Sequence, residues 1–220
     1  MTLADRISQV QARIARACGE AGREPSTVEL LPVSKKQPLE SIEAAAALGF
    51  RRFGENYVQE GAAKAEARPD LAFTLIGPLQ RNKAKLALQR FDELQTVDRV
   101  DLAHRLARLA EELDLRPGIW IQVDLWDEET KLGGCAEAGL PALLDALKDA
   151  PRLELRGLMA IPPPDQPRAF AQLAALRERL RQSLGRDLRL SMGMSHDLEA
   201  AIAAGSDQVR IGTAIFGERR

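Results

Sequence analysis

Two lysines directly after an apolar segment are the first residues of this chain that could do chemistry. Residues 28–33 form a short run rich in branched side chains, which predicts a buried strand followed closely by Lys35 and Lys36. Ligands bind at the carboxyl ends of the strands in parallel α/β folds, so an amine placed there could attack a carbonyl group. The alternative is that both lysines are loop residues with solvated amines.

Two loops near the other end of the chain could bind a phosphate. The first runs from Ser191 to Ser195 and leads into an alanine-rich helix, and the second contains Gly212 and Thr213. Glycine allows the backbone to approach a ligand closely, and the N–H groups at the start of a helix favour a bound phosphate. Taken singly, each loop is a weak signal, because such loops are also common helix caps.

Strand and helix patterns alternate along the whole chain around these residues. Short apolar runs predict eight strands, at 28–33, 51–54, 71–76, 94–97, 119–123, 153–159, 188–190 and 208–211. Helical patterns follow them, at 41–48, 55–67, 79–91, 98–113, 137–148, 166–183 and 195–204, with a helical turn after residue 211 and an extra helix at 3–17. This order predicts one domain over residues 1–220, an α/β fold of the (β/α)8 TIM-barrel class. A doubly wound open sheet is the alternative.

A barrel of this kind would bring the lysines and the two loops together. The loops after the seventh and eighth strands commonly hold a phosphate, and here they would face the end of the first strand across the barrel mouth. This arrangement fits a Schiff base between a lysine and a phosphorylated aldehyde, and pyridoxal 5′-phosphate is the cofactor that combines both groups. A barrel isomerase or aldolase that acts on a phosphorylated sugar is an alternative.

The composition excludes several other classes of function. With 220 residues, 45% of them hydrophobic, and a net charge of -1, the chain has no positive excess for nucleic acid or for an anionic membrane surface. It has no bilayer-length apolar run and no signal-like start, so we expect a cytoplasmic protein. The cysteines and histidines are isolated from one another, which predicts no metal site.

Six motifs resemble the signatures of the pyridoxal-phosphate homeostasis proteins. They lie at 33–35, 53–60, 76–83, 156–162, 191–195 and 209–213, in the order of the family. The resemblance implies a barrel like the N-terminal domain of alanine racemase, with pyridoxal phosphate bound as an aldimine to Lys35. In many relatives a threonine stands at the position of Lys36, and alternation along an extended chain should send this second amine to the other side.

The resemblance also implies roles for further residues. The phosphate is expected at the two loops, which supply Ser191, Met192, Gly193, Ser195, Gly212 and Thr213. Arg210 would lie at the pyridine nitrogen, where a permanent cation disfavours protonation and makes the ring a weaker electron sink. Asn56 is expected to contact the ring or its hydroxyl, with capping of the next helix as the alternative.

A basic face carries Arg81, Lys83 and Lys85. It is either a solvated helix face or a docking site for a phosphorylated ligand, and Lys131 has the same two interpretations.

Acid–base chemistry separates a carrier from an enzyme. Racemisation needs proton-transfer groups on both faces of the ring. In alanine racemase a second domain supplies one of these groups, and 220 residues leave no room for such a domain. Tyr57 is the only tyrosine of the sequence, and it is not a convincing substitute for that group. We therefore expect a non-catalytic, monomeric protein that binds pyridoxal phosphate, buffers it and hands it to apo-enzymes. A single-domain amino-acid racemase with Lys35 as its one base is the alternative.

Overall fold

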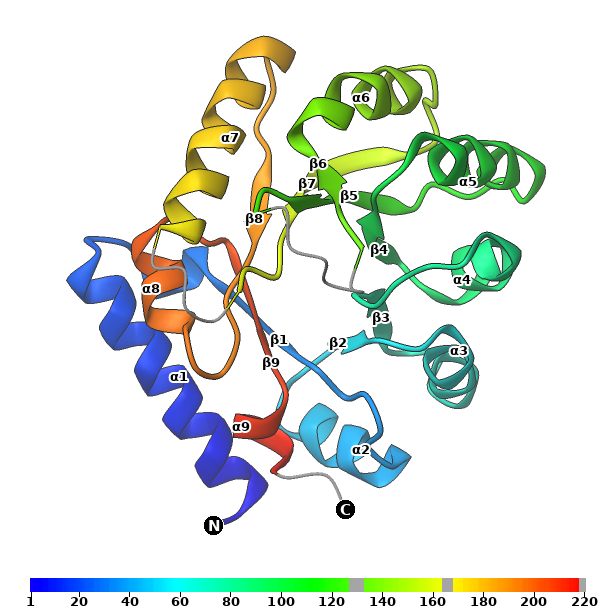
Figure 1. Cartoon of the computed structure of the whole chain (residues 1–220). Helices are drawn as coiled ribbons and strands as arrows, with labels where there is room; N and C mark the ends of the chain where they lie inside the picture. The colour runs from blue at the N-terminus through cyan, green and yellow to red at the C-terminus, as the bar shows by residue number, and fades with distance from the viewer. Residues whose placement is uncertain (127–132, 164–167, 218–220) are drawn as a thin grey trace.

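A ring of parallel strands lies at the centre of the molecule, with helices around its outside (Figure 1). The computed structural model describes residues 1–126, 133–163 and 168–217. Neighbouring strands follow the order β1, β9, β8, β7, β5, β4, β3, β2, and every pair is parallel. An isolated parallel bridge between Val33 and Gly54 joins β1 to β2 and closes the ring. The predicted (β/α)8 barrel is thereby confirmed, and the open sheet is wrong.

The eight predicted strands are all present in the described part of the chain. The strands are β1 Glu29–Pro32, β2 Arg52–Glu55, β3 Ala72–Leu75, β4 Glu93–Val97, β5 Gly118–Asp124, β6 Cys135–Ala136, β7 Glu154–Met159, β8 Arg189–Ser191 and β9 Gln208–Ile211. The short strand β6 was not expected from the sequence, and it pairs with the end of β5 outside the ring. The eight predicted strands therefore correspond, in the same order along the sequence, to the eight strands of the barrel.

Several helices begin later than the sequence pattern predicts. The helices are α1 Leu3–Glu20, α2 Leu39–Ala47, α3 Val58–Ala67, α4 Ala84–Arg90, α5 Val100–Glu112, α6 Leu140–Lys148, α7 Ala169–Leu184, α8 Leu198–Ala203 and α9 Thr213–Phe216. Helix α3 starts three residues after the predicted Glu55 because that residue still belongs to β2. Before α4, Arg81–Lys83 form a short 3-10 helix, and before α8 the chain forms a loop that reaches the cavity through Ser195.

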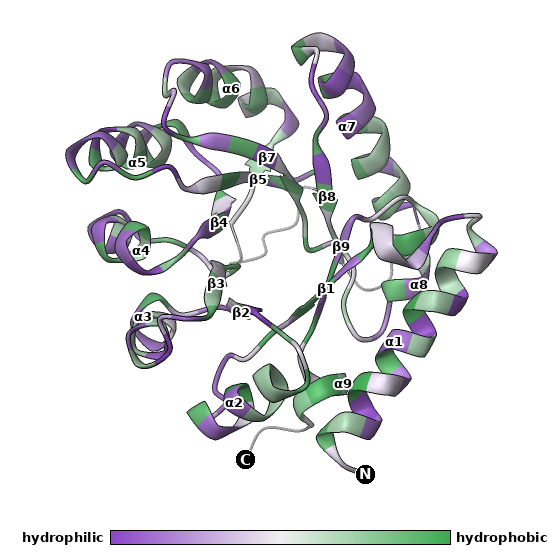
Figure 2. Ribbon diagram, turned by 180° about the vertical axis from the view of Figure 1, so that it is seen from behind, coloured by the Kyte–Doolittle hydropathy of each residue, from purple (hydrophilic) through white to green (hydrophobic). Residues whose placement is uncertain are grey.

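The extra N-terminal helix α1 packs on the outside of the barrel against α8 and α9. Its polar and apolar residues alternate along its length, as Figure 2 shows by hydropathy. The apolar face, with Ile7, Val10 and Ile14, joins a cluster that includes Leu198 and Ile215. Helix α1 therefore supports the two elements that follow the predicted phosphate loops. None of the helices in the described part of the chain combines the length and the apolar character that a membrane span requires.

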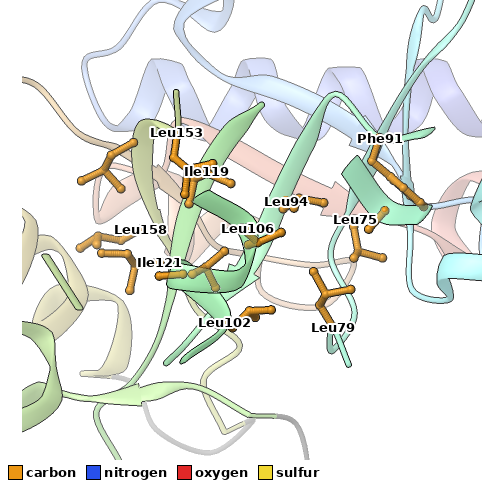
Figure 3. Packing of buried hydrophobic residues seen from close by; sticks show 14 of the residues in the cluster. Leu75, Leu79, Phe91, Leu94, Leu102, Leu106, Ile119, Ile121, Leu153 and Leu158 are labelled. Carbon is orange, nitrogen blue, oxygen red and sulfur yellow. The ribbon is translucent and has the colours of Figure 1, made fainter. Parts of the chain in front are cut away.

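The main hydrophobic core fills the space between the barrel and its helices. Figure 3 shows strand residues such as Leu94 and Ile121 packed close to Leu102 and Leu106 of α5. The buried positions of the ring also include polar residues, among them Gln95, Ser191, Gln208 and Arg210. Hydrophobic burial between the layers stabilises the barrel, at about 25 cal/mol for each Å² of apolar surface removed from water. The buried polar residues need another explanation, which lies in the candidate site.

Candidate functional site

A cavity of about 190 Å³ lies where the ends of β1, β2 and β9 meet. Six of the nine residues predicted to bind a cofactor line it, namely Lys35, Asn56, Ser195, Arg210, Gly212 and Thr213. Its other lining residues are Val33, Gln37, Ile76, Ile161, Met194, His196 and Gly217, which the sequence did not single out. Most of these seven lie inside or next to the recognised motifs, so the motif boundaries were a signal for them. The cavity thus combines one amine, one guanidinium, hydroxyl groups and apolar walls.

The two lysines diverge because the chain turns sharply after β1. The N–H of Gln37 donates to the carbonyl oxygen of Ser34 at 3.0 Å, and Lys36 has a φ of 58°, in the left-handed region. Lys35 is half-buried and lines the cavity. The amine of Lys36 lies 5.9 Å from the ring centroid of Tyr57, and Lys36 is exposed. The separation is therefore produced by a turn, and not by alternation along an extended strand.

A network of buried charges holds this turn against β2 and α3. The Nζ of Lys64 donates to the carbonyl oxygen of Ser34, to Glu55 Oε1 and to Glu60 Oε1, each at 2.7 Å. The Ser34 hydroxyl donates to Glu55 at 2.7 Å, and the N–H of Lys36 donates to Glu60 at 2.5 Å. These five residues are called the turn clamp below. This network is not apparent from the sequence, although the spacing of Glu60 and Lys64 by four residues on a helix is a signal for one of its ion pairs.

Glu55 is the most deeply buried charge of the turn clamp. Its side chain is 0% exposed, and that of Lys64 is 9% exposed. Burial raises the pKa of the Glu55 carboxyl, while the charge and hydrogen bond of Lys64 act in the opposite direction. Its second oxygen, Oε2, has no hydrogen-bond partner among the described residues. The ionised carboxylate therefore depends on Lys64.

Asn56 presents an unsatisfied oxygen at the cavity. It lines the cavity, and its Oδ1 atom is buried without a hydrogen-bond partner in the described part of the chain. Helix α3 has Tyr57 at its N-cap and no side-chain cap, so the capping role for Asn56 is wrong. Gly77 lets the backbone lie close here, since a Cβ atom at that position would be 2.1 Å from the Asn56 carbonyl oxygen. A buried acceptor of this kind calls for a donor on a ligand.

The loop after β9 lies directly beside the end of β1. A Cβ atom on Gly212 would be 3.3 Å from the carbonyl oxygen of Val33. Thr213 follows, at the start of α9, and Ser195 reaches the same cavity from the loop between β8 and α8. The hydroxyl loops and the Lys35 turn thus meet at one cavity, although more than 150 residues separate them in the sequence.

Three predicted phosphate residues lie elsewhere. Ser191 is 0% exposed, and its Oγ lies 2.8 Å from both Gln95 Oε1 and an Nη of Arg210. Met192 is also 0% exposed and belongs to the hydrophobic core. Gly193 has a φ of 95°, and a Cβ atom there would be 2.5 Å from that of Ala201, so it serves the packing of the loop on α8.

The buried side chains of Ser191 and Met192 do not fit direct contact with a ligand, and we correct that expectation, whereas a phosphate contact through the backbone N–H of Gly193 stays a prediction. Strand β8 continues through Ser191, so its side chain is directed by the strand into the barrel interior.

Arg210 is a buried cation at the cavity wall. It is 4% exposed and donates at 2.8 Å both to the Ser191 hydroxyl and to the carbonyl oxygen of Ala160. Burial lowers the pKa of Arg210 to about 10, with the charge of Asp197 acting in the opposite direction. At neutral pH the guanidinium therefore stays charged, and no carboxylate among the described residues forms an ion pair with it.

The predicted basic face has the features of a solvated surface. Arg81 is 61% exposed and lies 3.8 Å from Asp101, and neither it nor Lys83 or Lys85 lines the cavity. Lys131 lies outside the described residues. The described residues contain no group of three or more His, Cys, Asp or Glu side chains that could hold a metal ion.

Comparison with known proteins places this chain among relatives of the same length and fold. The family model of the alanine racemase N-terminal domain matches residues 6–220. A protein of Pseudomonas aeruginosa called pyridoxal phosphate homeostasis protein is 47% identical over 224 residues, which cover 99% of this chain and 96% of the relative. The protein of that name in Escherichia coli is 44% identical over 233 residues, which cover 99% and 97%.

Solved structures show the same relationship. The structure of PipY from Synechococcus elongatus with PLP bound matches with a TM-score of 0.87 at 37% identity, over 98% of this chain and 100% of the other. An alanine racemase of Clostridium difficile matches with a TM-score of 0.78 at 13% identity, over 99% of this chain and 56% of the enzyme. The second likeness concerns the fold alone.

Proposed function

This chain belongs to the family of pyridoxal phosphate homeostasis proteins, and we propose that it holds pyridoxal 5′-phosphate reversibly in the cavity at its barrel mouth. One observation carries the proposal: Lys35, which bears an amine, and Thr213, which bears a hydroxyl, line the same cavity from opposite ends of the chain. The amine suits an aldehyde, and the hydroxyl loops suit a phosphate. A monomeric carrier in the cytoplasm that passes the cofactor to apo-enzymes is part of this proposal.

The residues present fit the cofactor at two further points. The buried Asn56 Oδ1 has no partner among the described residues and can accept a hydrogen bond from a hydroxyl group of the ligand. Arg210 is a buried donor that can face the lone pair of a pyridine nitrogen. Both atoms are otherwise costly to bury, so a ligand that pairs with them stabilises the site.

Each residue of the cavity then has one task. When bound, pyridoxal phosphate supplies an aldehyde carbon that is open to attack by an amine. Lys35 would hold the cofactor at this carbon through its amine nitrogen. Ser195 and Thr213 donate to the phosphate, and the turn clamp keeps the amine in position.

Arg210 favours storage of the cofactor over catalysis. A cation at the ring nitrogen opposes its protonation, so the ring withdraws electrons from a substrate carbanion less strongly. The relatives named above are called homeostasis proteins, which agrees with a non-catalytic role. A racemase remains the second candidate because His196 lines the same cavity as Lys35 and could act as a second proton-transfer group.

A visible spectrum followed by chemical trapping tests the proposed function. We expect a yellow protein whose visible band disappears with borohydride, and peptide mapping should find the reduced adduct on Lys35. An adduct on Lys36 would contradict the site, and a colourless protein after incubation with the cofactor would contradict the function. Loss of Cα deuterium from alanine at about 1 per second or faster would instead support the racemase.

Substitution of Thr213 by valine tests the phosphate contact. The variant keeps the shape of the side chain but removes its donor, and a hydrogen bond to a charged group contributes about 1.5–3 kcal/mol. We therefore expect binding of pyridoxal phosphate to weaken by about 10- to 100-fold in a titration of the visible band. Thr27→Val, at an exposed threonine before β1, is the matched control and should bind like the wild type. Equal affinity of the two variants would contradict the contact.

A further inference from the structure

A chain of four buried polar side chains crosses the interior of the barrel at Arg210. The side chain of Gln95, on β4, donates at 2.7 Å to Gln208 on β9 and accepts at 2.8 Å from the Ser191 hydroxyl on β8. Ser191 accepts in turn from Arg210 at 2.8 Å. Strands β4 and β9 are separated in the ring by β5, β7 and β8, as Figure 1 also shows. A hydrogen bond between their side chains must therefore pass through the barrel interior.

The hydrogen bonds between these four polar side chains all have the same donor-to-acceptor direction, starting from Arg210. A guanidinium can only donate, so the Ser191 oxygen is the acceptor for Arg210. The single proton of Ser191 therefore lies on the far side from Arg210, where Gln95 Oε1 at 2.8 Å and Gln208 Oε1 at 3.0 Å are its two acceptors. In each of these hydrogen bonds the donor lies on the side nearer Arg210 in the sequence of contacts, so the orientation of Ser191 follows from that of Arg210. The amide nitrogen of Gln208 has no hydrogen-bond partner among the described residues.

The hydrogen-bond partners of the Arg210 guanidinium among the described residues are neutral. Arg210 contacts the Ser191 hydroxyl and the Ala160 carbonyl oxygen, and no ion pair with a described carboxylate neutralises it. A buried charge without an acid partner is costly unless hydrogen bonds support it. The polar chain supplies that support and leaves the guanidinium positively charged at the cavity, with Asp197 as a nearby charge of opposite sign that is not hydrogen-bonded to it. An acid in place of Ser191 would satisfy the cation and remove this property.

We propose that Ser191 and Gln95 are positioning residues that hold the guanidinium of Arg210 in one orientation at the cavity, and thereby set the charge state of the ring nitrogen of the ligand. The part about the ring nitrogen rests on the proposed function. The part about Arg210 concerns the protein alone and can be tested without a ligand.

The ligand-free protein gives the first test, by ¹⁵N NMR of its arginine side chains. Wild type should show one slowly exchanging guanidinium signal that disappears in Arg210→Lys and so belongs to Arg210. In Ser191→Ala we expect this signal to exchange with water at least about 10-fold faster, because one hydrogen bond of the guanidinium is lost. An unchanged exchange rate would overturn the proposal.

The same strand offers a matched control. Thr96 lies next to Gln95 on β4, is 1% exposed, and its hydroxyl has no hydrogen-bond partner among the described residues. Thr96→Val therefore removes a buried hydroxyl without touching the polar chain, and its Arg210 signal should match the wild type. Gln95→Met serves as a second variant if Ser191→Ala fails to fold, and it should also accelerate exchange. Equal acceleration in Thr96→Val would overturn the proposal, since it would mean general loosening of the interior.

The loaded protein gives the second test, by pH titration of the visible band of bound pyridoxal phosphate. We expect the midpoint to shift by about one pH unit in Ser191→Ala, a 10-fold change in proton affinity, and to stay in place in Thr96→Val. In an Arg210→Met background, Ser191→Ala should add no further shift, because Ser191 acts through Arg210. A full additional shift there would overturn the proposal. A wild-type protein without a visible band would contradict the proposed function, and the NMR result would still decide the positioning of Arg210.

Discussion

Lys35→Met is expected to abolish covalent binding of pyridoxal phosphate. The thioether fills a similar volume but cannot form a bond to the aldehyde carbon, so only the phosphate and ring contacts remain. We expect the apparent affinity to fall by more than about 100-fold, which corresponds to about 3 kcal/mol. Equilibrium dialysis measures the affinity, and mass spectrometry after borohydride should find no adduct at a stoichiometry near that of the wild type.

Lys36→Met is the matched control for this prediction. It removes an amine one residue away whose Nζ lies over the ring of Tyr57, outside the cavity lining. We expect adduct formation in this variant to equal that of the wild type. Full labelling of Lys35→Met at another lysine would show that the cavity does not select its amine by position, and it would refute the assignment of Lys35.

Lys64→Met is expected to lower the free energy of unfolding by about 3 kcal/mol or more at neutral pH. Removal of one partner of a buried ion pair leaves the other charge uncompensated, which typically costs 3–5 kcal/mol. Here the uncompensated group is the Glu55 carboxylate, which is 0% exposed. Because Lys64 also donates to the Ser34 carbonyl oxygen, the turn that carries Lys35 should loosen as well. Urea unfolding measures the stability, and Lys85→Met, at an exposed lysine of α4, should be nearly neutral.

The pH dependence identifies Glu55 as the source of this loss. Its folded pKa is raised by burial above the value of 4.5 of a free carboxyl, so the folded state binds more protons, and stability falls as pH rises from that value through the folded pKa. Without Lys64, two effects that lower the pKa disappear, and this window extends to higher pH. The difference between variant and wild type should therefore be smaller at about pH 5 than at pH 8.

A double variant completes the test. Glu55→Gln removes the charge that Lys64 compensates, so Lys64→Met combined with Glu55→Gln should recover part of the lost stability at pH 8. If the double variant were as unstable as the sum of both single variants, Glu55 and Lys64 would act independently. The turn clamp would then not be the reason for the destabilisation.

The barrel could be predicted from the sequence because its elements are encoded locally. Short branched runs such as 119–123 and amphipathic helices such as 98–113 repeat in strict alternation, and parallel strands joined in this way close into a barrel when eight are present. The same local order brings the residue after a strand to the barrel mouth. The placement of Lys35 and Thr213 at one cavity was therefore predictable from their positions at strand ends.

Side-chain directions at the ends of elements were not predictable in this way. The sequence pattern placed Ser191 in a loop, but Ser191 is the last residue of β8. Lys36 has a left-handed backbone conformation, which directs its side chain away from the cavity. Glu55 looked like the first residue of a helix, but it is the last residue of β2. In each case the outcome depends on where the hydrogen bonds to a neighbouring strand stop, and that neighbour is remote in the sequence.

By itself the sequence determined the order of the elements, the family and the amine at the end of the first strand. The tertiary structure alone decided which polar groups are buried together. Gln95 and Gln208 are 113 residues apart in the sequence and form a hydrogen bond with each other. Lys64 has the sequence pattern of a surface lysine, but in the folded protein it is buried beside Glu55. The physical reason is that a buried polar group is stable only with its partner, and the closed barrel brings these partners together from distant strands and helices.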